Sequence, residues 1–277
     1  MIKKRTLIYS ACWVLITFFN ALGQDSTVVA PANPNFRIGP FGQFLLGKHY
    51  REVWETPVEA PIFDINSFRG GMRILKLGGG NQTKTLRMID STNVQFNLRT
   101  IDKYPALTLP KSFRKTWVNK VVKDQISTAH PYGFMVMPKL AEAIETYHTN
   151  PKLYYVPKNS SFDTLQNYTL SYGDKLFMIE IRPDENLSEF DQFGNSKNVV
   201  GTEKLFEKLR EDNDNSIDAF DFAKVRLLDI IVGDWDRHED QWRWAEFDKD
   251  DKGTLFRAVP RDRSGFFKVR WLFTYHL

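Results

Sequence analysis

Apolar and polar residues alternate through the middle of the chain. Residues 73–77, 83–89 and 94–99 follow this pattern, with a glycine-rich loop after the first run and an Asp-Ser-Thr-Asn turn before the third. Side chains of a strand point alternately to the two faces of a sheet, so a period of two indicates strands. The pattern predicts an antiparallel meander, and the apolar runs 153–156 and 176–181 predict two further strands.

Helical spacing of apolar residues marks three other segments, 113–129, 202–210 and 218–231. Asp218 and Asp221 fit the N-terminus of the third helix, because a capping carboxylate satisfies free backbone N–H groups there. The stripe expected on the first helix consists of Trp117, Val121, Val122 and Ile126. Strands with one helix come first and helices follow, which predicts an α+β fold with two lobes.

The first 23 residues have the pattern of a Sec signal peptide: a basic start, a short apolar run and small residues at its end. The run is short and interrupted by polar residues, so we expect cleavage rather than a membrane anchor. The predicted destination is the periplasm or the outer-membrane-associated cell surface. The chain then divides into a signal peptide (1–23), a leader and N-terminal extension (24–69), a β-rich N-lobe (70–183) and a helical C-lobe (184–277).

Removal of the signal peptide changes the charge balance. Without Lys3, Lys4 and Arg5, 35 of the 38 Lys and Arg residues remain against 34 Asp and Glu. A nearly neutral chain gives no indication of nucleic-acid binding. Cys12 is the one cysteine and leaves with the signal, so neither a disulfide nor a cysteine-ligated metal site is expected.

A charged and aromatic loop, VGDWDRHEDQWRW at 232–244, follows the last predicted helix, which we expect to be buried. Loops held by a rigid scaffold commonly carry binding or catalytic residues. Asp236-Arg237-His238 spells part of the two-metal motif of calcineurin-like metallophosphoesterases. Arg237 stands where that family requires a second Asp, and no Gly-Asn-His follows. A metallophosphoesterase is therefore the less favoured interpretation.

Residues 233–238, GDWDRH, also resemble the Gly-x-x-Asp-Arg-His catalytic loop of atypical kinases: the HipA-type, secreted Golgi and phosphatidylinositol kinases. The resemblance implies a two-lobed atypical protein-kinase-like fold whose catalytic loop holds Asp236, Arg237 and His238. Asp262 resembles the metal-binding Asp of that group, and Gln241 stands where HipA-type kinases place a metal-binding Asn. Kinases hold metal ions on the nucleotide phosphates. The expected cofactors are Mg²⁺ or Mn²⁺ with ATP or another nucleotide.

The kinase resemblance extends in order through the N-lobe. The triple glycine after the first predicted strand resembles a phosphate-covering loop, whose backbone amides donate to anionic oxygens. Lys103 is the first choice for the phosphate-pairing cation and Arg99 the alternative, with Asp124 on the helix as a partner. Residues 178–183 resemble the hinge between lobes, where backbone groups bind the purine. The predicted nucleotide-binding residues are Gly78, Gly79, Gly80, Arg99, Lys103, Asp124 and Glu180.

Residues 40–267 resemble, in addition, an uncharacterised exported domain found especially in Bacteroidetes. The motifs that carry this resemblance are FLLG at 44–47, YREVW at 50–54, DQIS at 124–127, GDWDRH at 233–238 and PRDR at 260–263. That domain often accompanies a calcineurin-like phosphoesterase domain and an outer-membrane barrel. The resemblance implies a place at the outer membrane and an outer-membrane protein as a partner.

Three departures bear on catalysis: Gln241 replaces the metal-binding Asn of HipA-type kinases, Ser264 stands where the family usually has a further Asp, and the chain ends 15 residues after Asp262. A kinase C-lobe continues with more helices, so we expect a truncated C-lobe. Two hypotheses remain open. One is an exported kinase-like domain, active or degenerate, that binds a nucleotide or another phosphorylated ligand with a divalent metal. If active, it would be a phosphotransferase whose acceptor is a phosphorylated small molecule or a protein. The other is a non-catalytic accessory module of an outer-membrane or cell-surface assembly.

Three structural consequences are expected from the kinase hypothesis. Trp242 and Trp244 should mark a strand after the catalytic loop, with one ring packed inward and the other nearer the cleft. Arg237 should pair with a carboxylate or a backbone carbonyl and brace the loop, as should His238. The carboxylates of Asp236 and Asp262 should lie about 5 to 9 Å apart, the reach of a shared metal site.

Overall fold

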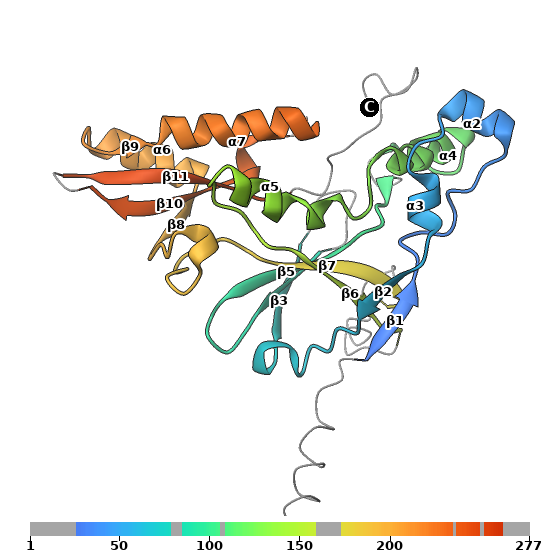
Figure 1. Ribbon diagram of the computed structural model, residues 1–277, viewed down its shortest axis with the longest axis horizontal. Coiled ribbons are helices and arrows are strands. Elements are labelled where there is room, and N and C mark those ends of the chain that lie inside the picture. Colours follow the sequence, from blue (N-terminus) through green and yellow to red (C-terminus); the bar gives the residue numbers. More distant parts are fainter. Residues whose placement is uncertain are drawn as a thin grey trace, which may run out of the picture.

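The computed structural model describes residues 26–78, 85–105, 109–158, 173–234, 237–249 and 252–262. These residues form two larger sheets, a two-stranded sheet and several helices (Figure 1). The predicted α+β class is confirmed, while the kinase-like arrangement of two lobes stays a prediction. In the described ranges, no helix is long and apolar enough to cross a membrane. The predicted signal peptide lies outside them.

An antiparallel sheet of five strands forms the centre of the fold. Its strands are β3 (Arg73–Gly78), β4 (Thr85–Ile89), β5 (Gln95–Thr100), β6 (Lys152–Val156) and β7 (Lys175–Ile181). Their order in space is β3-β4-β5-β7-β6. The chain therefore leaves the predicted meander after β5 and returns so that β7 lies beside β5. All five predicted strands are confirmed.

Strand alternation gives this sheet one apolar and one mainly polar face. The apolar face packs with Phe63 of the N-terminal extension into a buried cluster: Leu86, Met88, Phe96, Leu98, Phe177 and Ile179. The opposite face carries Arg87, Asn97, Arg99 and Glu180 in its middle. At the β6 end that face becomes apolar, where Met178 joins a second cluster with Phe134 and Met137.

The N-terminal extension is an integral part of the fold. It forms β1 (Thr27–Ala30), α2 (Pro40–Leu46), α3 (Arg51–Glu55), β2 (Val58–Pro61) and the 3₁₀ helix η1 (Phe68–Gly70). β1 and β2 pair antiparallel. Trp54 is 1% exposed, and its indole N–H donates to the carbonyl of Ala129 at 2.9 Å. This contact ties the extension to the segment that follows the predicted first helix.

The predicted first helix is confirmed as α4 (Trp117–Asp124) followed by the 3₁₀ helix η3 (Gln125–Thr128). The stripe expected on it is wrong at Trp117, which is 73% exposed. The chain continues through η4 (Gly133–Met135) and α5 (Met137–Ala143) before it enters β6. Phe134 and Met137 of this segment cover the apolar end of the otherwise polar sheet face.

The segment predicted as a helical C-lobe contains a second sheet as well as helices. After η6 (Asp191–Phe193), it forms β8 (Val199–Gly201), α6 (Thr202–Glu211), β9 (Ser216–Ile217), α7 (Ala219–Val232), η7 (Glu239–Gln241), β10 (Trp242–Asp248) and β11 (Thr254–Pro260). The strand order is β8-β10-β11-β9. Leu205 of α6 and Val225 of α7 pack on this sheet. The second sheet and its two helices lie beside the five-stranded sheet (Figure 1).

The tryptophans after the charged loop lie on a strand, as predicted, because β10 begins at Trp242. Their expected division between core and cleft is wrong. Trp242 and Trp244 are both buried in the same cluster, with ring centroids 6.2 Å apart. Residues two apart on a strand share one face, so both rings reach the side covered by α6 and α7.

Helix α7 leads into the charged loop and has the predicted cap. The carboxylate of Asp218 accepts a hydrogen bond from the backbone N–H of Asp221 at 2.9 Å. Gly233 ends the helix with a φ of 74°, in the left-handed region where glycine is favoured. The apolar sequence of the helix led us to expect that it is wholly buried, and this expectation is wrong. Phe220, Leu227, Ile230 and Ile231 are exposed.

Candidate functional site

The middle of the polar sheet face is the starting point of the site. Strand register places Arg87, Asn97 and Glu180 in one row across β4, β5 and β7, with Arg99 in the adjacent row. Asn97, Arg99 and Glu180 are buried. Burial of polar and charged groups costs free energy unless they have partners, so such a face requires an explanation.

Arg99, Glu180 and Asp262 meet on this face. The guanidinium of Arg99 donates to the carboxylate of Asp262 and lies 3.7 Å from Oε1 of Glu180. Arg99 comes from β5 and Glu180 from β7, while Asp262 follows β11 of the second sheet. Arg99 was the alternative choice for the cation, and the structure brings it to the predicted metal-binding Asp. Lys103, the first choice, lies in the loop after β5.

Asp262 has an unusual backbone conformation. Its φ is 58°, in the left-handed region that residues other than glycine rarely adopt. Its side chain is 35% exposed, unlike the buried side chains of Arg99 and Glu180. Asp262 is therefore the member of the trio that solvent or a ligand can reach.

Burial and charge shift the pKa values of this trio. Burial is the largest influence on Glu180 and raises the pKa of its carboxyl, as does the charge of Asp262, while Arg99 opposes the shift. For Arg99, burial lowers the pKa, but Asp262 and Glu180 together outweigh it and raise the pKa of the guanidinium. The site therefore keeps its arginine charged and favours the neutral form of Glu180.

Glu180→Gln is expected to flatten the dependence of stability on pH. Because the folded pKa of Glu180 lies above its usual 4.5, the folded state holds this proton more tightly than the unfolded state. That contribution is complete below pH 4.5 and is lost as pH rises through the raised pKa. Urea unfolding from pH 4 to 8 measures the slope, with the exposed Glu211→Gln as control. An unchanged slope in Glu180→Gln would contradict the buried neutral carboxyl.

Arg237 braces the charged loop, as predicted. Its side chain is 1% exposed and donates to the carboxylates of Asp229 and Asp234. It also donates to the backbone carbonyl of Arg261 at 2.5 Å, and its guanidinium lies 5.3 Å from the ring centroid of Trp242. Arg261 directly precedes Asp262, so Arg237 fixes the end of α7 against the strand that delivers Asp262.

The other described residues of the predicted catalytic loop have different surroundings from those expected. Gln241 is buried, and its Oε1 accepts from Nη1 of Arg237 at 3.3 Å. Its amide oxygen thus helps to hold Arg237, and its predicted contact with a metal stays a prediction. His238 is exposed and contributes its backbone carbonyl to the N–H of Gln241 at 3.0 Å. His238 thus contributes to the order of the loop through its backbone.

Asp124 belongs to a separate ion pair in the structure. Arg51 donates to both oxygens of its carboxylate, at 2.5 and 2.7 Å. The side chains are 5% and 10% exposed. Asp124 thus pairs with an arginine of the N-terminal extension. This corrects the prediction that Asp124 pairs with the phosphate-pairing cation, Lys103 or Arg99. This pair holds α3 against the end of α4.

The segment predicted as a hinge is strand β7 inside the sheet. Its backbone pairs with β5 through Ile181 and with β6 through Ile179. A paired backbone is not free to bind a purine, so the predicted hinge contacts are corrected for this part of the segment. Glu180 enters the site through its side chain instead.

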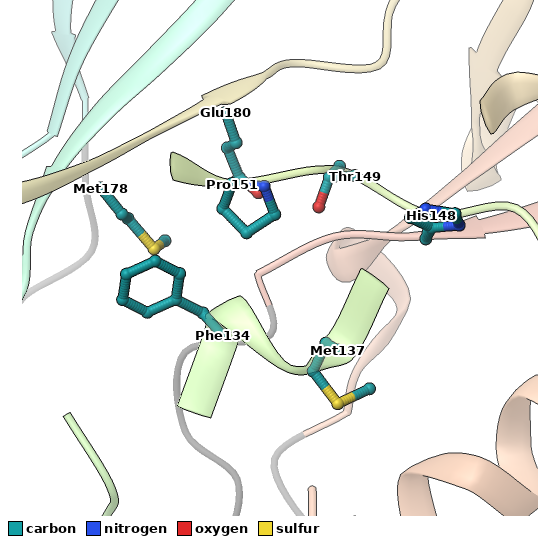
Figure 2. A pocket seen from close by; sticks show the side chains of 7 residues that line it. All are labelled: Phe134, Met137, His148, Thr149, Pro151, Met178 and Glu180. Carbon is teal, nitrogen blue, oxygen red and sulfur yellow. The ribbon is translucent and has the colours of Figure 1, made fainter. Parts of the chain in front are cut away.

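A small cavity lies beside Glu180, between β7 and the segments around α5 (Figure 2). Its volume is about 10 Å³. That volume holds about one water molecule, whereas ligand pockets reach hundreds of cubic ångströms. The cavity is too small for a nucleotide base. It is lined by Phe134, Met137, His148, Thr149, Pro151, Met178 and Glu180.

Several predicted residues lie outside the described part of the chain. Asp236 is one, so its distance from Asp262 remains a prediction. Gly79 and Gly80 are two more, while Gly78 ends β3. Within the described ranges, no group of three or more His, Cys, Asp or Glu residues could hold a metal ion.

Sequence reasoning missed the arginines that surround the trio. Arg87 lies on β4, Arg182 follows β7, and Arg243 and Arg261 come from the second sheet. The Nε atoms of these four residues and of Arg99 are buried, and none has a hydrogen-bond partner among the described residues. A charge at the centre of the otherwise apolar run TLRMI was the available signal for Arg87.

Comparison with known proteins identified no relative: no family model, no curated protein and no solved structure matches this chain.

Proposed function

We propose that this chain binds a nucleotide or another phosphorylated ligand, together with a divalent metal, where the polar face of the first sheet meets the end of β11. The convergence of Arg99, Glu180 and Asp262 carries the proposal. The first and last of these stand 163 residues apart; Arg99 lies on β5 of the first sheet and Asp262 follows β11 of the second. A kinase-like site requires a cation for the phosphates and a carboxylate for the metal at one place.

The donor set fits Mg²⁺ or Mn²⁺ brought in by a phosphorylated ligand. Magnesium is commonly held by one or two carboxylates, with phosphate oxygens and water completing its shell. Asp262 is the accessible carboxylate that would hold the metal, and Glu180 lies behind it. When bound, the metal would neutralise charge on the phosphates. Arg99 contributes a fixed positive charge beside it, and Arg237 keeps the strand end in place.

The alternative is an accessory module of an outer-membrane or cell-surface assembly that binds without turnover. One observation favours it: the amide of Gln241, the predicted second metal ligand, is bound to Arg237. In this version the ligand orders the site but no phosphate is transferred. An exported kinase-like phosphotransferase would act on a phosphorylated small molecule or a protein acceptor.

Asp262→Asn is expected to remove the metal-dependent part of nucleotide binding. In a thermal-shift scan with ATP and ADP, each with Mg²⁺ or Mn²⁺, the unaltered chain should gain stability. A ligand at a hundred times its Kd adds about 2.7 kcal/mol. The Asn variant should bind the metal nucleotide at least tenfold more weakly, because it loses a charged metal ligand. Asp248→Asn, at an exposed position of β10, is the matched control.

No response of the unaltered chain to any nucleotide with either metal would contradict the proposal. A response without release or transfer of phosphate would favour the accessory module over the phosphotransferase.

A further inference from the structure

Four arginines gather beside the trio, from both sheets. Arg243 on β10 and Arg261 after β11 donate to one acceptor, the carbonyl of Asp240, at 3.5 and 2.7 Å. Two hydrogen bonds anchor Arg182 to Gln95. The backbone N–H of Arg182 donates to the carbonyl of Gln95 at 2.8 Å, and Nη1 of Arg182 donates to Oε1 of Gln95 at 2.9 Å. Arg87 projects from the middle of β4 on the same face of the sheet.

The positive charges of this arginine cluster, Arg87, Arg182, Arg243 and Arg261, act on one another. Burial, followed by the charges of the other three arginines, lowers the pKa of Arg182 to about 10. Burial and the charge of Arg243 lower the pKa of Arg261 to about 10. These guanidinium groups are therefore close enough to repel in a partly buried setting, which disfavours the unliganded fold.

Negative charges offset the cluster only in part. Asp184 forms an ion pair with Arg182, on which the charge of Glu185 also acts, and the charge of Asp240 acts on Arg243. Glu180 and Asp262 act on Arg261 but are already engaged with Arg99. For the described residues, the four Nε atoms of the cluster are buried without a hydrogen-bond partner. A planar guanidinium matches phosphate oxygens in geometry and in charge.

We infer that the arginine cluster is a phosphate-binding site that needs no metal, adjacent to the metal-dependent site at Asp262. The inference deepens the proposed function and rests on it for one point only, that the natural ligand is phosphorylated. Two sources share this chemistry: a phosphate of the nucleotide itself, or a phosphate already carried by the acceptor. Carboxylate-mediated binding requires a divalent cation, whereas binding by guanidinium groups alone does not.

The test measures binding of inorganic pyrophosphate to the full chain by calorimetry, in EDTA and with ionic strength held constant by chloride. The unaltered chain should bind, and Arg87→Gln and Arg243→Gln should each raise the Kd at least tenfold. Arg73→Gln, on the exposed edge strand β3, should leave the Kd unchanged. Arg87 has no hydrogen bond to lose in the described structure, so its variant should fold and show a melting temperature equal to or above that of the unaltered chain.

Two results would overturn the inference: no binding of pyrophosphate in EDTA, or equal binding by the unaltered chain and by both cluster variants. Asp262→Asn separates this inference from the proposed function, because it should keep pyrophosphate binding in EDTA while losing the metal-dependent response to ATP. Competition between pyrophosphate and ATP with Mg²⁺ would assign the cluster to the nucleotide. Simultaneous binding would assign it to a phosphorylated acceptor, and either result supports the site.

Discussion

Arg237→Met is expected to lower the free energy of unfolding by about 3–5 kcal/mol, the usual cost of removing one partner of a buried ion pair. The side chains of Arg237, Asp229 and Asp234 are 1%, 1% and 5% exposed. Methionine would leave the two carboxylates without the guanidinium that now binds them both. It would also remove the hydrogen bond to the carbonyl of Arg261, which anchors the strand end before Asp262.

Urea unfolding followed by circular dichroism measures this change. Arg210→Met, at an exposed position of α6, is the matched control and should shift stability by less than about 0.5 kcal/mol. Adding Asp229→Asn and Asp234→Asn to Arg237→Met should recover part of the loss, because the buried charges are then removed together. A loss below about 1 kcal/mol in Arg237→Met would show that the loop does not depend on this brace.

Asp124→Ala is expected to lower the free energy of unfolding by a similar amount, about 3–5 kcal/mol. The change would leave the guanidinium of Arg51 buried without the carboxylate that balances its charge and accepts two of its hydrogen bonds. Arg51 lies on α3, so the loss would loosen the N-terminal extension from α4. The metal-dependent nucleotide response of the folded fraction should stay the same, since Asp124 is paired outside the site.

Unfolding in urea and nucleotide titration at low temperature measure the two parts of this second prediction. Asp248→Ala is the control for removal of an exposed carboxylate. If Asp124→Ala kept full stability but lost the response to nucleotide, Asp124 would be a ligand-binding residue and its structural assignment would be wrong.

The regular elements were predictable because each has a local cause. Alternation at 85–89 and 94–99 and the apolar run at 176–181 reflect strands with a buried face, and the structure has β4, β5 and β7 there. The Asp218 cap and Gly233 mark the two ends of α7 through backbone hydrogen bonds made within a few residues. The pairing of Arg237 with a carboxylate or a backbone carbonyl was expected from the kinase-like interpretation of the loop, and the structure shows both kinds of contact.

The elements of the N-terminal extension were not predicted, because their order comes from distant contacts. Residues 24 to about 40 carry three prolines and no periodicity, so this part of the segment indicates a leader when it is taken alone. Trp54 is buried through the carbonyl of Ala129, and Arg51 through Asp124, both more than 70 residues away. Short elements of this kind gain most of their stability from packing, which leaves little periodic signal in the sequence.

The sequence by itself determined the α+β class, the strands of the five-stranded sheet, the helices α4, α6 and α7, and the three residues that meet at the site, Arg99, Glu180 and Asp262. Tertiary structure alone decided that Arg99 binds Asp262, that Asp124 binds Arg51, and that four arginines from two sheets lie together. Periodicity specifies which face of a strand a side chain occupies, because that depends on the backbone of the strand itself. Which residues contact that side chain depends on strand order and on how the sheets pack. Both are set by contacts between residues far apart in the chain.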